Sequence, residues 1–398
     1  MSKSFPKSPE VRPPQGFTLV ELLVAMALTL ILLGIAFNIF DKLNNAADLA
    51  GTMADVNENL RAGTNMIARD LSTAGAEIPL GGFPLPSGGT PCQAIKIPLP
   101  AWLPAQVFNP ACSGNMNVIT PGSGFGPPSG SGGTEIPTDA ITLITVNPTS
   151  QLNEFQLFSI SPVTTSGAYC CFPAGTISVT ITVNPATNGG DLTAAGASQV
   201  LPGQLIMLTN ANSAVLLAVS SVTASTITFT SGDAANDVLG LNQFPTAAGS
   251  PTSGNIGQLQ TLGAAPAANF YPATYAYQVT MTTYYLDNVS RAPTWMLMKQ
   301  VGTGAPLTGT PPTVPSQPPQ PVAMGINVLQ FAYSLYPAAE PTDPTRTFVG
   351  SYTPKTIRKV NLWLIAKADH PNRKSGLYYT NSAATSVTAQ NLAYYNQY

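Results

Sequence analysis

The chain has 398 residues, of which 44% are hydrophobic and only 9% are charged. An average soluble domain carries about 25% charged residues, so the polar surface here has to be built mainly from uncharged side chains. The net charge of −2 and the lack of any basic run give no electrostatic footprint for nucleic acid. The length supports one large domain or two ordinary ones, and the 34 Gly and 38 Pro favour turn-rich β structure outside the cytosol over a cytosolic enzyme.

The N-terminus combines a polar leader with a long apolar segment. Residues 1–16 are polar and carry three basic residues against Glu10, and residues 17–40 form a mostly apolar run. At about 1.5 Å per residue this run reaches about 36 Å, which is enough to cross a hydrocarbon core of about 30 Å. Basic residues before the run and Asp41 after it predict a leader in the cytoplasm and the rest of the chain in the periplasm.

The junction between leader and apolar run differs from an ordinary secretory signal, in which a small-residue cleavage site follows the apolar stretch. Here the small residue at the junction is Gly16, which precedes the stretch. Cleavage after Gly16 would leave the whole apolar helix on the mature protein, beginning at Phe17.

Glu21 places a carboxylate five residues into that mature helix. An acid at membrane depth costs about 2.5–3.5 kcal/mol on insertion scales and is a functional candidate by default. The new α-amino group of Phe17 would supply a cation at nearly the same depth, either within one chain or from a neighbouring subunit. The alternative interpretation is a tolerated glutamate close to the membrane interface.

The stretch GFTLVELLVA, from Gly16 to Ala25, resembles the class III prepilin signal of type IV pilins and type II secretion pseudopilins. The resemblance implies that a prepilin peptidase cuts between Gly16 and Phe17 and methylates the Phe17 amine. It also implies that Glu21 recruits and registers subunits in a filament. Two features depart from the common pattern: the leader is long, and Asn38 stands near the position where many major pilins carry a proline.

The helical pattern continues beyond the apolar run as an amphipathic spine over residues 41–75. Apolar residues recur every three or four positions, and no proline occurs between Pro14 and Pro79. One helix within residues 17–78 is therefore predicted. The segment NLRAGTNMIARDLSTAG, starting at Asn59, is similar to PilW-like minor pilins and to J-type pseudopilins. Arg69 and Asp70 are expected only to solvate or cap the end of this helix.

Residues 79–135 are rich in Pro and Gly and predict an irregular loop region. Four cysteines fall there and in the following region: Cys92, Cys112, Cys170 and Cys171. Their number fits disulfides in an oxidising compartment, with Cys92–Cys112 the favoured pair, cross-pairing open, and free buried thiols the alternative. No CxxC spacing supports a zinc site.

Short β-branched segments bounded by turn residues begin at Asp139 and predict strands. In residues 136–265 they are 139–146, 154–160, 176–183, 204–209, 214–222 and 225–230. This stretch is expected to be an inserted β-rich subdomain. In residues 266–398 the predicted strands are 273–287, 294–301, 326–336 and 356–368, separated by a polyproline-like connector at 311–321 and followed by a tyrosine-rich tail.

The fold predicted from these parts is α+β: a long N-terminal transmembrane and amphipathic helix packed on an antiparallel β-sheet pilin head, with the inserted β-rich subdomain. The tyrosines of the tail are expected to pack against the sheet, with a contact surface for a neighbouring subunit as the alternative.

No catalytic constellation is found, and the chain is predicted not to be an enzyme. His370 is the only histidine, so a Ser-His-Asp or Cys-His arrangement would have to use it. It stands before Pro371 and is expected in an exposed turn. Neither a metal site nor a cofactor is predicted, since the carboxylates lack a calcium-loop spacing and Asp233 and Asp237 are expected to be turn residues.

The predicted function is a minor type IV pilin that is incorporated into a pilus or initiates one. The resemblance implies the prepilin peptidase, the major and other minor pilins, the inner-membrane assembly platform and the inner membrane as partners. The subunit would first lie in the inner membrane as a single-pass protein with a periplasmic head, and later in the pilus at the cell surface. The alternatives are a J-type pseudopilin and a pilus-displayed adhesin or ligand-binding module that uses residues 136–265.

Overall fold

The computed structural model describes residues 16, 18–76, 78, 82–86, 115–124, 126–129, 138–146, 159–161, 177–183, 191–193, 199–244, 256–259, 272–288, 295–302, 318–335 and 357–389. The chain divides into two compact units. The anchor unit comprises Met1–Ala54 and His370–Tyr379, and the head unit comprises Asp55–Asp369 and Thr380–Tyr398. Helix α1 and the β15–β16 hairpin contribute residues to both units.

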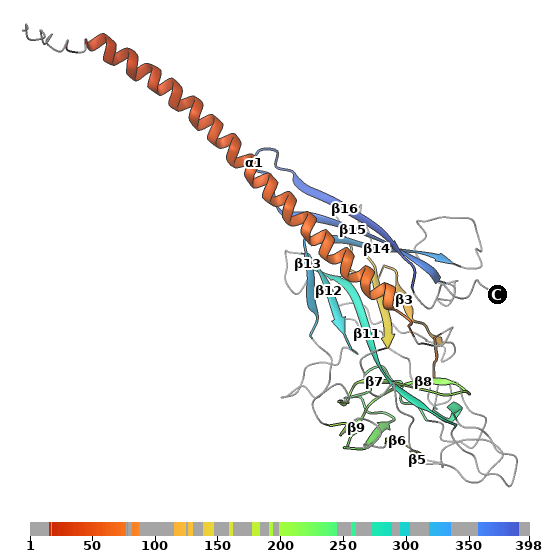
Figure 1. Ribbon diagram of the computed structural model, residues 1–398. Coiled ribbons are helices and arrows are strands. Elements are labelled where there is room, and N and C mark those ends of the chain that lie inside the picture. Colours follow the sequence, from red (N-terminus) through yellow and green to blue (C-terminus); the bar gives the residue numbers. More distant parts are fainter. Residues whose placement is uncertain are drawn as a thin grey trace, which may run out of the picture. The chain divides into compact units, whose positions relative to one another are not determined.

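Helix α1 runs without interruption from Leu19 to Thr73, 55 residues in all (Figure 1). The predicted amphipathic stripe is confirmed in its second half, where the buried residues follow steps of three or four: Val56, Leu60, Gly63, Ile67 and Leu71. The helix ends in a turn in which Gly75 takes a φ of 81°, a left-handed conformation that glycine adopts without steric cost. The described part of the helix has no break at Asn38.

Among the described residues of the head unit, the largest sheet has seven strands. Its main path is β13 (Gln320–Met324), β12 (Met296–Val301), β11 (Tyr275–Asp287), β4 (Ala140–Val146) and β3 (Ile119–Gly122), and β7 (Leu205–Thr209) pairs both β11 and β8 (Ala214–Ala218). All of the pairs recorded in this sheet are antiparallel. Strand β11 is long enough to pair with β4 through its middle and with β7 through its first residues. Strands from residues 136–265 and from 266–398 therefore share one sheet.

A second sheet contains β5 (Ser159–Ser161), β6 (Ser178–Thr182), β10 (Thr226–Thr230) and β9 (Ser221–Val222). Its strands alternate buried and half-exposed residues, as expected for a sheet with one face on a core. The buried side chains include Val179, Ile181 and Phe229, and they pack in one cluster with residues of β7, β8 and the 3-10 helix η2 (Ile256–Leu259).

The third sheet is formed by β14 (Ile326–Leu335), β15 (Ile357–Pro371) and β16 (Tyr378–Val387), which lie side by side in that order (Figure 1). The short strands β1 (Phe83–Pro84) and β2 (Asn115–Met116) pair separately. Asp139, just before β4, joins the first and third sheets. Its backbone N–H donates to Leu329 O at 2.8 Å, and its carboxylate accepts the N–H of Phe331, also at 2.8 Å.

The second half of α1 packs where the first and third sheets meet in the head unit. A Cβ placed on Gly63 would lie 3.0 Å from Leu297 on β12, 3.5 Å from Leu364 on β15 and 3.6 Å from Ala323 on β13. The missing side chain of Gly63 thus lets the helix backbone approach three strands from two sheets. The predicted α+β class, with the long helix on antiparallel sheets, is confirmed.

Four parts of the chain differ from the sequence interpretation. The predicted polyproline connector ends in strand β13, which includes Pro321, and the stretch placed in a tyrosine-rich tail contains strand β16. The predicted strand 214–222 is divided into β8 and β9, because the two halves pair in different sheets. Within the loop region, β1, β2 and β3 add short pieces of strand.

Candidate membrane and assembly site

The start of α1 is the region where the sequence placed its site residues. Gly16 and Glu21 are described, and Glu21 lies in the first turn of α1. Phe17, the rest of the leader and the four cysteines Cys92, Cys112, Cys170 and Cys171 lie outside the described residues. His370 is exposed, as expected, although it occupies the end of strand β15 and not a turn.

Thr18 and Glu21 form a reciprocal cap at the N-terminus of α1. The Thr18 backbone N–H and the Thr18 hydroxyl both donate to Glu21 Oε2, each at 3.0 Å. The Glu21 N–H donates in return to Thr18 Oγ1 at 3.3 Å, and the first helical bond runs from Leu22 N to Thr18 O at 3.2 Å. This is the capping-box arrangement, in which a threonine and a glutamate three residues later satisfy N–H groups that the helix leaves unpaired.

The cap holds one oxygen of the Glu21 carboxylate against the helix end, where the helix dipole favours a negative charge. These bonds do not supply a cation. In a membrane or among packed helices, where water is scarce, the carboxylate still needs a positive partner to offset its desolvation. The chemistry that this site can perform is therefore recognition of a cation, such as an α-ammonium group, at the depth of the first helical turn.

Thr18 caps the helix at this site, and the sequence analysis did not single it out. Its signal was present as the spacing Thr-x-x-Glu directly before an apolar run, which is typical of a capping box.

The first half of α1 is exposed and mostly apolar. Every described residue from Leu19 to Asn44 is exposed, with Leu19 at 75%, Leu32 at 67% and Leu43 at 61%. Helix α1 is long and apolar enough to cross a membrane, and its most apolar segment is not covered by any described part of the chain. An apolar surface of this extent is stable only in contact with lipid or with other apolar helices.

Catalytic or metal chemistry has no comparable support in the described residues. Among them, no group of three or more His, Cys, Asp or Glu side chains is placed to hold a metal ion. Asp233 and Asp237 lie close together in the loop after β10, but their carboxylates are engaged by backbone N–H groups and by Asn236 in that same loop.

Comparison with known proteins gives one match, which lies at this N-terminal site. Residues 12–37 match the family described as the prokaryotic N-terminal methylation motif. No curated protein and no solved structure matches the chain. The motif implies processing by a prepilin peptidase and assembly with pilins, and together with the apolar helix it supports membrane anchoring before assembly. The motif indicates a structural protein rather than an enzyme, and it supports a type IV pilin-like protein.

Proposed function

We propose that this protein is a minor type IV pilin, cut between Gly16 and Phe17, methylated on the Phe17 amine and built into a pilus or its initiating complex. The head unit would face the periplasm while α1 lies in the inner membrane, and it would reach the cell surface with the filament. Residues 1–16 would be the removed leader, and residues 17–40 the membrane anchor.

The observation that carries this proposal is the contrast between the two halves of α1. The second half is seated in the head unit through Val56, Leu60 and Ile67, whereas the first half is apolar and exposed from Leu19 onwards. A helix of this kind can exchange one apolar environment for another, leaving lipid and entering a bundle of similar helices. The hydrophobic effect then does not strongly favour the helix in lipid over the helix in a bundle, because both environments are apolar.

Glu21 would direct that exchange. The Thr18 cap orients the carboxylate at the helix start, and the α-ammonium of a neighbouring subunit would neutralise it in the bundle. A matched pair at one depth sets the axial register, because any slip leaves two unpaired charges in apolar surroundings. Within the membrane, the same uncompensated carboxylate favours departure from the lipid.

The NLRAGTNMIARDLSTAG segment supports a PilW-like minor pilin over a major subunit. A J-type pseudopilin remains the competing identity, and it would share the processing and the role of Glu21. Display of residues 136–265 as a binding module is a further hypothesis. Strands β4, β7 and β8 of that stretch belong to the seven-stranded sheet, so substitutions of its exposed residues, and not its deletion, separate display from an assembly role. Display predicts intact filaments that have lost attachment.

Mass spectrometry of the mature N-terminus tests the proposal, with sheared surface filaments and membranes measured separately. We expect a chain that begins at methylated Phe17 in the filament fraction. The same terminus confined to membranes would favour the pseudopilus. An intact Met1, or cleavage beyond residue 40, would overturn the proposal.

A further inference from the structure

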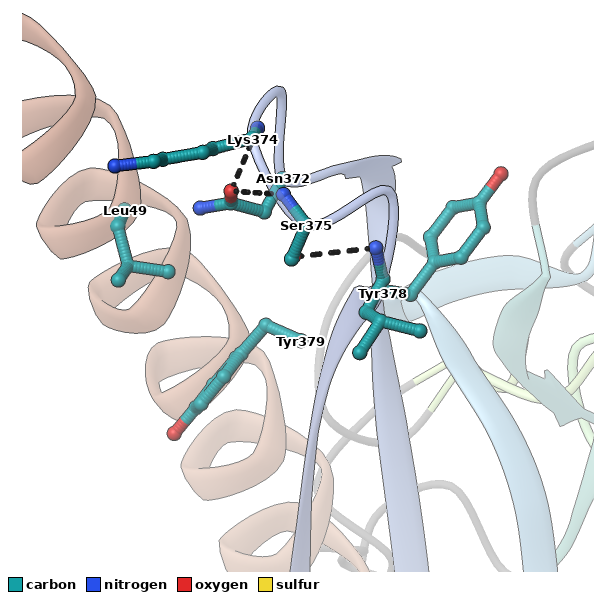
Figure 2. A pocket seen from close by; sticks show the side chains of 7 residues that line it. Leu49, Asn372, Lys374, Ser375, Tyr378 and Tyr379 are labelled. Carbon is teal, nitrogen blue, oxygen red and sulfur yellow. Dashed lines mark hydrogen bonds between the residues drawn. The ribbon is translucent and has the colours of Figure 1, made fainter.

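The turn between β15 and β16 is a compact, preorganised element of the anchor unit. Asn372 Oδ1 accepts the N–H groups of Lys374 at 2.9 Å and Ser375 at 3.1 Å, and the Asn372 N–H donates to Leu377 O at 2.8 Å. Gly376 completes the turn with a φ of 69°, which favours glycine. The side chains of this turn are therefore presented from a fixed backbone (Figure 2).

This turn lies beside α1 just after the apolar segment ends. Arg373 Nε is 4.0 Å from Asp48 Oδ2, and an open groove of about 430 Å³ is lined by Leu49 together with Lys374, Leu377 and Tyr379. Figure 2 shows the Lys374 side chain extended from the turn towards α1, and the Tyr379 ring pointing towards the same helix. The turn and the helical residues Asp48 and Leu49 both belong to the anchor unit. The distance of the turn from the membrane-spanning part of α1 is therefore set by the few helical residues in between.

The position along that helix gives the height of the turn above the hydrocarbon. The apolar run ends at Phe40, and Leu43 is the last large exposed apolar residue of α1. Asp48 follows these residues by eight and five positions, which correspond to about 12 Å and about 7.5 Å of helix. The headgroup layer on each side of a bilayer is about 5–8 Å thick. When α1 spans the bilayer, the turn thus stands at or just beyond the outer limit of the headgroups, within reach of long side chains.

The residues of the turn have the chemistry of a membrane interface. Arg373 and Lys374 supply two exposed cations, Leu377 is 71% exposed and Tyr378 is 43% exposed. Aromatic and basic side chains gather at the headgroup level, where an apolar body and a polar or charged tip are both accommodated. The Arg373–Asp48 pair does not remove this positive charge from solvent, because the two side chains are 83% and 62% exposed and such pairs are weak.

We propose that the β15–β16 turn and the strand ends beside it, residues 370–379, are a docking surface for anionic phospholipid headgroups, which Arg373 and Lys374 bind while Leu377 and Tyr378 enter the interface. The membrane-inserted subunit is then held at two points, by the span of α1 and by the turn beside it. The second contact restricts how the anchor unit tilts and rotates on the membrane. It is given up when the subunit leaves the lipid, so it acts only before assembly. This inference rests on membrane insertion of α1 and not on incorporation into a pilus.

Hydrogen exchange of the full chain in lipid nanodiscs tests the proposal. Amide exchange of residues 372–379 is compared between nanodiscs of phosphatidylglycerol and nanodiscs of phosphatidylcholine with the same acyl chains. A basic residue near an anionic surface contributes about 1 kcal/mol, so one or two of them predict exchange slowed by about 5- to 30-fold on the anionic lipid. The variant Arg373→Glu with Lys374→Glu should lose this difference, and it should exchange like the wild type on phosphatidylcholine if its turn is intact.

Lys359→Glu is the matched control, since Lys359 is an exposed lysine on β15 itself. It should leave the lipid dependence of the turn unchanged. Equal exchange on both lipids in the wild type would overturn the proposal. Protection that appears only at high protein density, whatever the lipid charge, would also overturn it and assign the turn to contact with a second copy. Mass spectrometry of the mature N-terminus, which tests the proposed pilin function, does not depend on the result of this lipid experiment. The two proposals can therefore fail separately.

Discussion

The Lys299 ammonium on β12 lies 2.6 Å from the Asp70 carboxylate near the end of α1. The same oxygen, Oδ2, accepts the Tyr284 hydroxyl of β11 at 2.6 Å, and Lys299 Nζ lies 5.7 Å from the centre of the Tyr284 ring. Burial and the neighbouring Asp70 carboxylate raise the pKa of Tyr284, so its hydroxyl remains a donor at all ordinary pH values. Asp70, expected to be a solvated helix end, instead fastens α1 to the seven-stranded sheet.

Loss of the Lys299 ammonium should therefore destabilise the head unit. The Asp70 and Lys299 side chains are only 15% and 19% exposed, so Lys299→Met would leave a poorly solvated carboxylate. Breaking a fully buried pair costs about 3–5 kcal/mol, and the residual solvent here lowers the expected loss to about 1–3 kcal/mol. Denaturant unfolding of the detergent-solubilised chain measures it. Arg69→Met is the control, because Arg69 is 73% exposed at 3.6 Å from Asp70, and it should change stability by less than about 0.5 kcal/mol.

A second prediction concerns the close approach of α1 to the sheets at Gly63. A valine there would push its Cβ and two methyl groups into Leu297 and Leu364, and such overpacking costs about 1–3 kcal/mol. Gly51→Val makes the same chemical change in the same helix, where a Cβ meets no atom within 4 Å. Thermal unfolding should show a lower midpoint for Gly63→Val and a nearly unchanged one for Gly51→Val. Equal effects of the two changes would mean that helix propensity, and not packing, governs Gly63.

A third prediction separates the cap from the charge at the start of α1. Glu21→Gln keeps an oxygen that can accept from Thr18 but removes the negative charge. We expect Glu21→Gln to be inserted into the membrane and cleaved normally. Its amount in sheared filaments should fall by at least about tenfold if one unpaired charge is worth over 1.4 kcal/mol. Glu58→Gln changes an exposed glutamate farther along α1 and should be incorporated normally. Full incorporation of Glu21→Gln would contradict a role for the charge and leave only the cap.

The fourth prediction follows from Asp237, whose burial raises its pKa to about 6 from 3.8. Its carboxylate accepts the N–H groups of Leu241 at 2.8 Å and Asn242 at 2.7 Å, which oppose the shift without cancelling it. Because the folded state holds this proton more tightly than the unfolded state, stability is greatest below about pH 4. It falls as the pH rises to about 6, by up to about 3 kcal/mol.

Thermal midpoints of the solubilised chain between pH 4 and pH 7 should show this fall. Asp237→Asn should flatten it, although the variant loses one acceptor and is less stable at low pH. A decrease of the midpoint with rising pH that is due to Asp139 should remain, since burial raises the pKa of that carboxyl as well. Asp191→Asn is the control: hydrogen bonds from Thr193 lower the pKa of Asp191, so its effect lies below this pH range. A midpoint that rises from pH 4 to pH 6 would contradict the assignment.

Local features of the sequence determined much of the architecture. The apolar run and the three-to-four spacing after it predicted α1 nearly to its ends, because helix periodicity is a property of consecutive residues. Segments such as 140–146 and 275–287 were found because β-branched and aromatic residues cluster there. The prepilin-type motif could also be recognised from the sequence, since it consists of about ten adjacent residues.

Strands with weaker local signals were missed, and tertiary pairing explains why they form. Strand β16 consists largely of small polar residues and is stabilised by pairing with β15. Strand β13 includes Pro321, which has no N–H to donate, and a register shift between Leu297 and Met298 of β12 accommodates it at the sheet edge. Neither strand could be recognised without its partner.

The sequence by itself determined that this protein carries an exposed apolar helix with a capped carboxylate at its start, because those properties depend on residues within a few positions of one another. Only the tertiary structure decided which strands share a sheet and that Asp70 meets Lys299, across 229 positions in the chain. It likewise decided that the β15–β16 turn lies beside Leu49. Such contacts depend on the path of the whole chain, since the free energy that fixes them comes from burial shared among many distant residues and not from any local pattern.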